Sequence, residues 1–160
     1  DCVIASAYCS HAEGMCTTAS ADCSHAEGEG TVASGEASHA EGSSTTAAGA
    51  NSHAEGFKTY AGFNAHAEGY NTYALGQSSH AEGDSTKANG SNSHAEGSET
   101  IAEGNNSHAE GGNTLASGEK SHAEGYDTKA TKHSAHSEGR WTTASGTGAH
   151  AEGESSIASG

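Results

Sequence analysis

The stretch SHAEGSETIAEGNN at residues 93–106 is one copy of the 14-residue unit that decides the fold. The tetrad His-Ala-Glu-Gly at its start occurs eleven times from His11 to His150, once with Ser137 in place of Ala. Successive tetrads begin 14 residues apart, except that His66 follows His53 after 13. Self-similarity at a fixed period is the sequence signature of a repeat architecture, so we expect a solenoid.

Each half of the unit alternates small residues with variable ones. Ser107, Ala109 and Gly111 share one parity, whereas His108 and Glu110 share the other. A period of two predicts extended strands with opposite faces. Glycine then ends each strand with the backbone angles of a tight turn. Five residues of strand plus two of turn, taken twice, predict an all-β fold. This fold is a parallel β-roll (β-solenoid) of about 11 rungs and roughly 55 Å.

The composition fits this fold only if the core is thin. Val, Ile, Leu and Phe number nine, and the net charge is −15, a combination that is typical of disorder in a chain without repeats. Because burying the His and Glu residues would be prohibitive, we expect Ser, Thr, Ala and Gly to point inward. Backbone hydrogen bonds between rungs then carry most of the stability.

The same composition excludes several functions. Six Lys and Arg against 21 Asp and Glu argue against binding nucleic acid through its phosphates. No apolar run is long enough for a membrane helix, so we expect no membrane insertion. No secretory signal is recognisable, and we expect a mature chain or a piece of a longer one.

The heptads Ser-x-Ala-x-Gly, paired in 14-residue units from Val3 to Gly160, resemble the YadA-type head repeats of trimeric autotransporter adhesins. The motif Ser-His-Ala-Glu-Gly is similar to repeats of surface proteins and of phage neck-appendage or tail-fibre proteins. The resemblance implies a left-handed roll of three chains, hence a homotrimer. It also implies the shaft or head of a fibre that is extracellular, on the cell surface or on a virion, with a host-surface protein or glycan as receptor. The family usually carries Val and Ile at the outward positions of one strand, where this chain has His and Glu.

The outward His and Glu residues are the least variable positions and form two columns on one face. Stacked Glu side chains repel each other by about 0.9 kcal/mol per neighbouring pair in water, so the Glu column needs a partner. We expect three chains to meet here, with His of one chain bonding Glu of the next. This predicted trimer interface comprises His11, Glu13, His25, Glu27, His39, Glu41, His53, Glu55, His66, Glu68, His80, Glu82, His94, Glu96, His108, Glu110, His122, Glu124, His136, Glu138, His150 and Glu152.

Two alternatives for these columns stay open. One is a solvated polar face. The other is a metal-binding His ladder, because stacked imidazoles beside carboxylates suit zinc or nickel. The chain has neither a helical His-Glu-x-x-His motif nor a Cys-x-x-Cys pair, so the sequence predicts no dedicated metal site and no cofactor.

Cys2, Cys9, Cys16 and Cys23 lie seven residues apart at turn positions. Stacking at about 4.8 Å places Cys2 near Cys16 and Cys9 near Cys23, within the range that disulfides accept. We therefore expect these two bonds to staple residues 1–23 as the N-terminal cap of a single domain spanning 1–160. Disulfides indicate an oxidising compartment. Interchain bridges and reduced thiols remain alternatives.

Two irregular regions are candidate ligand patches. Near the 13-residue spacing lie Phe57, Tyr60, Phe63, Tyr70 and Tyr73 beside Lys58, which could stack on sugar rings or dock a partner. Further on lie Lys129, Lys132, His133, Arg140 and Trp141, where Lys132 replaces the expected Gly. Packing of the aromatics over the shortened rung and local charge balance are the competing interpretations.

The sequence predicts no enzyme, because equivalent His and Glu pairs on a flat sheet define no unique concave pocket. Ice binding is an alternative because flat Thr-bearing solenoids can order water. The regular Thr column, which includes Thr31 and Thr45, has the inward parity, however. The favoured function is a structural or adhesive β-roll.

Overall fold

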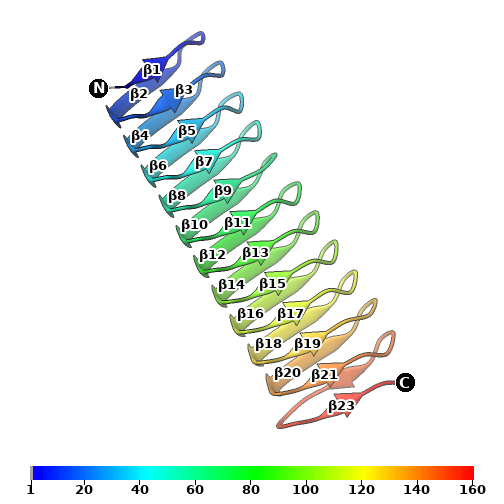
Figure 1. Cartoon of the computed structure of the whole chain (residues 1–160). Helices are drawn as coiled ribbons and strands as arrows, with labels where there is room; N and C mark the ends of the chain where they lie inside the picture. The colour runs from blue at the N-terminus through cyan, green and yellow to red at the C-terminus, as the bar shows by residue number, and fades with distance from the viewer. Residues whose placement is uncertain (1) are drawn as a thin grey trace.

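The computed structural model describes residues 2–160 as a stack of about eleven rungs (Figure 1). Two parallel sheets face each other, one of 11 strands and one of 12, and each strand pairs only with its counterparts in the rungs above and below. The stack runs from the N-terminal rung at one end to the C-terminal rung at the other. The all-β parallel solenoid expected from the repeat is therefore confirmed.

The 11-stranded sheet consists of the strands that carry His-Ala-Glu-Gly. These are β2 (His11–Met15), β4 (His25–Glu29), β6 (His39–Ser43), β8 (His53–Phe57), β10 (His66–Tyr70), β12 (His80–Asp84), β14 (His94–Ser98), β16 (His108–Gly112), β18 (His122–Tyr126), β20 (His136–Arg140) and β22 (His150–Ala151).

The 12-stranded sheet has strands of two residues each. These are β1 (Ile4–Ala5), β3 (Thr18–Ala19), β5 (Val32–Ala33), β7 (Thr46–Ala47), β9 (Tyr60–Ala61), β11 (Tyr73–Ala74), β13 (Lys87–Ala88), β15 (Ile101–Ala102), β17 (Leu115–Ala116), β19 (Lys129–Ala130), β21 (Thr143–Ala144) and β23 (Ile157–Ala158). The expectation of two equal five-residue halves is wrong, because a turn takes up the rest of this half. In one rung that turn is closed by a hydrogen bond from the backbone N–H of Ser93 to the Gly90 carbonyl oxygen at 3.2 Å.

The core contains only small side chains, as the parity argument predicts. Ala102 and Ala109 are fully buried, as is Thr100 between the sheets, and Ser107 is 2% exposed. Gly111, however, is exposed although it shares the parity of Ser107 and Ala109, whereas Gly104 in the other half is buried. The inward set of a regular rung is therefore Ser, Ala, Thr, Ala and this second Gly. The Ser also closes the turn before it, for example through the Ser93 hydroxyl, which donates to the Gly90 carbonyl oxygen at 2.6 Å.

Among the glycines that end the strands, the expected backbone angles are found only at the tetrad glycines, since Gly97 has a φ of 107° whereas Gly90 has no positive φ. The left-handed corner residues are not these glycines but the residues two positions later, such as Asn92 and Glu99, with φ of 56° and 58°. The glycines are also required where rungs touch. A Cβ on Gly97 or Gly90 would overlap the carbonyl oxygen of the equivalent glycine in the next rung, Gly111 or Gly104.

The missing residue in the shortened rung is absorbed in a turn, and the strands on either side stay in register. Ala61 pairs with Ala47 and with Ala74, as in regular rungs. Only the bonds at the corner change, since the Gly62 N–H alone donates to the Ala74 carbonyl oxygen at 2.8 Å, where regular rungs use two consecutive N–H groups.

Candidate functional site: the histidine and glutamate ladder

The His and Glu columns lie side by side on the outer face of the 11-stranded sheet. Each strand begins with its His, and the Glu follows two residues later, so the two side chains share a face. In-register pairing of β8 with β10 places His53 beside His66 and Glu55 beside Glu68. The structure thus brings the predicted interface residues together in two continuous rows.

The imidazole rings stack along the whole column. Neighbouring ring centroids are 4.7–4.9 Å apart. Beyond the first pair the rings are nearly parallel, whereas His11 is turned by 64° from His25. The column therefore has a spacing set by the backbone, while its terminal ring has a different orientation.

Each His pairs with the Glu of its own strand. The distance from His Nε2 to Glu Oε2 runs from 3.2 Å in β20 to 3.7 Å in β4 and β6. The Glu column therefore has His partners within its own chain, and the bond from His of one chain to Glu of the next stays a prediction. The side chains along the middle of the ladder are about one-third exposed, as His53 and Glu55 are at 36% each.

Two histidines of the ladder, His66 and His108, are biased toward neutral imidazole. Burial lowers the pKa of His66 below its usual value, and the neighbouring imidazoles of His53 and His80 lower it further, while Glu68 and Glu55 oppose the shift. The pKa of His108 is lowered in the same way by burial and by His122 and His94. A positive charge on these two rings is thus disfavoured.

A shallow groove of about 660 Å³ runs beside the Glu column over the first four of these strands. Glu13, Glu27, Glu41 and Glu55 line it together with the adjoining glycines. It is open, and its repeated lining offers no single catalytic constellation.

The cysteines are placed as the repeat predicts but are not bonded. Cys9, Cys16 and Cys23 occupy left-handed corners, and the Cys23 N–H donates to the Tyr8 carbonyl oxygen at 2.8 Å, so the corners of successive rungs are adjacent. All four cysteines are exposed free thiols in the structure, and the predicted Cys2–Cys16 and Cys9–Cys23 disulfides are not formed there.

The first candidate ligand patch is only partly assembled. Phe57 and Tyr70 stack with ring centroids 5.2 Å apart, and Lys58 Nζ lies 5.2 Å from the Phe57 centroid. Tyr60 and Tyr73 pair on the other sheet and border a hollow of about 230 Å³ with Lys58. Phe63 instead lies in the turn that follows β9.

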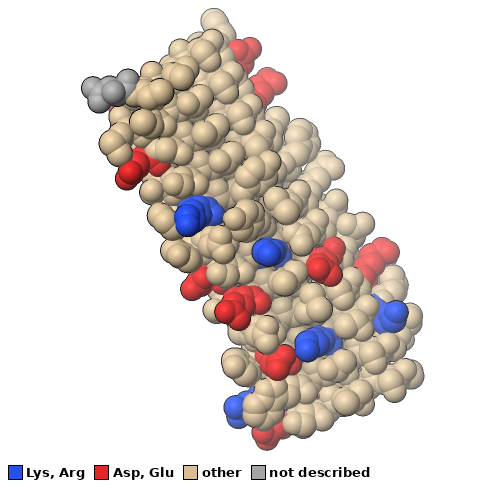
Figure 2. All heavy atoms as spheres, viewed as in Figure 1, with Lys and Arg blue, Asp and Glu red and all other residues tan. Residues whose placement is uncertain are grey.

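The second candidate patch is divided between elements. The Arg140 guanidinium lies 3.9 Å from the Trp141 ring centroid at the end of β20. Lys129 Nζ lies 3.7 Å from Asp127 Oδ1, as local charge balance predicts. Lys132 and His133 belong to the turn after β19. Figure 2 likewise shows Lys and Arg scattered among Asp and Glu on the visible face, in no continuous row.

The geometry defines this protein as a parallel β-solenoid that carries an ordered polar ladder. A model of the YadA head domain repeat matches residues 26–56, 62–86, 88–107 and 142–160, which together are more than half of the chain. The chain therefore belongs to the YadA head repeat family, a family of structural, adhesin-type repeats, and the expected resemblance is confirmed. No curated protein matches the chain. Within residues 2–160, no helix is long and apolar enough to cross a lipid bilayer.

Proposed function

We propose that the chain is a rigid structural segment, a shaft or head, of an extracellular adhesive fibre on a cell or virion surface. The observation that carries this proposal is the uninterrupted parallel stack with an Ala, Ser and Thr core, in a chain that belongs to the YadA head repeat family. Each rung is hydrogen-bonded to its neighbours through the backbone, so the stack is rigid along its axis without large side chains.

We further propose that three chains associate through the His and Glu ladder, in the left-handed arrangement that the family implies. The ladder is uniform, while the facing sheet's outward positions vary from Val32 to Lys87 to Ile101. Its side chains are already one-third exposed rather than fully solvated, and a second chain would cover the remainder. Intrachain pairing leaves each Glu with a second oxygen that a neighbouring chain can use as an acceptor.

Light scattering on matched variants tests the location of this interface. Glu82→Arg and Glu96→Arg together place positive charge on the ladder, and we expect them to reduce the measured mass to that of one chain. The control pair Lys87→Glu and Ile101→Glu makes a comparable change on the facing sheet and leaves the mass unchanged. Loss of assembly in the control pair alone would place the interface on the other sheet.

We also propose that the aromatic patch binds a glycan receptor. Phe57, Tyr70 and Tyr73 present ring surface near Lys58, as sugar-binding surfaces do. Glycan-array binding that is lost in Tyr70→Ala and kept in Tyr126→Ala, an exposed tyrosine at the equivalent position of β18, supports this assignment. Equal binding by both variants refutes it.

A further inference from the structure

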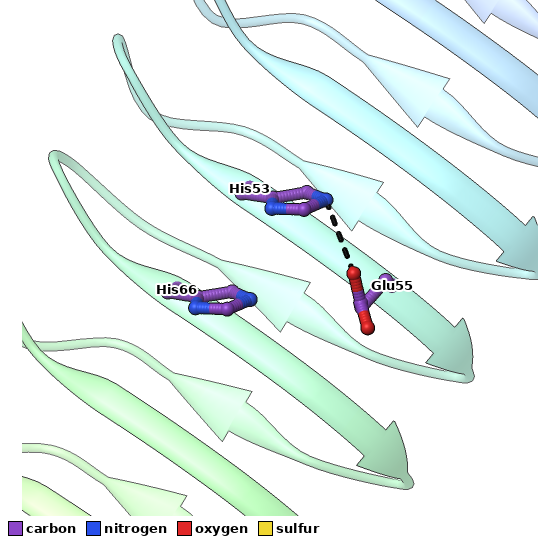
Figure 3. Close-up of side chains that lie close together, drawn as sticks. All are labelled: His53, Glu55 and His66. Atoms are coloured by element: carbon purple, nitrogen blue, oxygen red, sulfur yellow. Dashed lines mark ion pairs between the residues drawn. The ribbon is translucent and has the colours of Figure 1, made fainter.

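The ladder repeatedly places two imidazoles and one carboxylate within reach of one ion. His53, Glu55 and His66 each offer one donor atom, and these atoms all lie within 4.8 Å of one another. Figure 3 shows the two rings parallel, on adjacent strands β8 and β10, with the Glu55 carboxylate beside their edges. The same triad recurs with His66, Glu68 and His80 and continues along the sheet.

The His nitrogens of these triads have no hydrogen-bond partner. The Nε2 atoms of His53, His66 and His80 are covered from solvent and make no hydrogen bond, although a Glu oxygen lies near each of them. A covered nitrogen without a partner is costly, and it is the atom that a metal ion binds. A neutral ring offers the Nε2 lone pair while the proton stays on Nδ1.

The spacing requires the two rings of each site to move toward each other. Zinc binds nitrogen at about 2.0–2.1 Å in tetrahedral geometry, so two Nε2 atoms on one ion lie about 3.3 Å apart. The ring centroids of His53 and His66 are 4.8 Å apart, and the two rings must tilt toward each other. The 64° angle between His11 and His25 is evidence that ring rotation is compatible with the backbone.

We propose that the ladder binds divalent transition-metal ions such as Zn²⁺, with each ion held by the His residues of two adjacent rungs and the Glu between them. Two nitrogens and one oxygen suit zinc, nickel or copper rather than magnesium or calcium, which prefer oxygen ligands. Each His serves one ion at a time. The 11 strands of this sheet each supply one His, so one chain holds five ions with one His left over.

Because each ion needs His residues from two adjacent rungs, the order in which His residues are removed separates ordered sites from nonspecific binding. In an alternating variant, His25, His53, His80, His108 and His136 become Gln, and no two adjacent rungs keep His. In a block variant, His11, His25, His39, His53 and His66 become Gln, and six consecutive His remain. Both variants lose five His, so their compositions are identical.

The chains are refolded with ZnCl₂ so that the ladder is open to ions before chains associate, and bound zinc is measured after dialysis. We expect five ions per chain for the parent, three for the block variant and none for the alternating variant, with excess Mg²⁺ displacing none. Equal zinc in the two variants, or none in the parent, overturns the proposal. Circular dichroism verifies that each variant folds, and light scattering of the same samples reports chain association separately from metal content.

Discussion

Replacing Gly97 with Ala tests whether its backbone angle and its contact with the next rung together require glycine. Gly97 has a φ of +107°, outside the left-handed region that Ala tolerates, and its added Cβ would overlap the Gly111 carbonyl oxygen. Backbone strain costs about 1–3 kcal/mol and overpacking about 1–3 kcal/mol, so we expect a loss of about 2–6 kcal/mol. For a chain of this size, that loss lowers the melting temperature by roughly 5–20 °C.

Substitutions at two other glycines separate the cost of the backbone angle from the cost of the rung contact. Gly90→Ala meets the same overlap, with Gly104, but has no positive φ, and other rungs carry Ala21 and Lys132 at this position. We expect it to cost about 1–3 kcal/mol. Gly30→Asn is the neutral control, because Gly30 has a φ of +63° with only Ser44 Oγ nearby, and Asn71 occupies the same corner column. Melting followed by circular dichroism measures all three, and a Gly97→Ala chain as stable as Gly30→Asn would refute the reasoning.

Three further predictions concern the core, the ladder and the cysteines. Thr100→Val should raise the free energy of unfolding by about 1 kcal/mol, because the buried Thr100 hydroxyl has no hydrogen-bond partner. Thr142→Val should lower it, because Thr142 Oγ1 lies 2.8 Å from Ser137 Oγ. Urea unfolding that ranks the two variants the other way contradicts this prediction. Because the folded pKa of His66 and His108 lies below the ordinary 6.5, the unfolded chain binds protons more readily. The stability of the neutral rings is therefore present above pH 6.5 and lost as the pH falls toward the lowered values. The melting temperature in chelator should fall over that interval, less so for His66→Gln with His108→Gln, and a flat profile contradicts the assignment. Air oxidation should link Cys2 to Cys16 and Cys9 to Cys23 in peptide maps; four free thiols after oxidation, or bonds between chains, would show that the stacked corners do not form these staples.

The repeat made the architecture predictable because parity and period act on every rung at once. Ser107 and Ala109 had to point inward once His108 and Glu110 were too polar to bury, and the structure has that arrangement. The role of glycine could not be read in this way. A Gly at a strand end suggests a turn. Whether a Cβ at position 97 would overlap the Gly111 carbonyl oxygen depends instead on how closely two backbones stack.

Pattern reasoning made the His column the obvious partner of the Glu column but did not predict that each pair forms within one strand. Parity places His53 and Glu55 on one face, but only side-chain geometry brings Nε2 within 3.4 Å of the Oε2 atom in the same strand. The bond between Ser137 and Thr142 was missed as well. The sequence did contain a signal, since Ser137 is the one departure from Ala in the tetrad. A hydroxyl in a buried Ala column predicts a buried hydrogen-bond partner, which is Thr142.

The mass of the assembled protein tests the central claim most directly. One chain has a mass of 15.8 kDa, and three chains together have 47.4 kDa. Sedimentation equilibrium of the parent chain at micromolar concentration, in chelator, should return the mass of three chains. A single species with the mass of one chain would contradict the proposal that the ladder joins three rolls into a fibre.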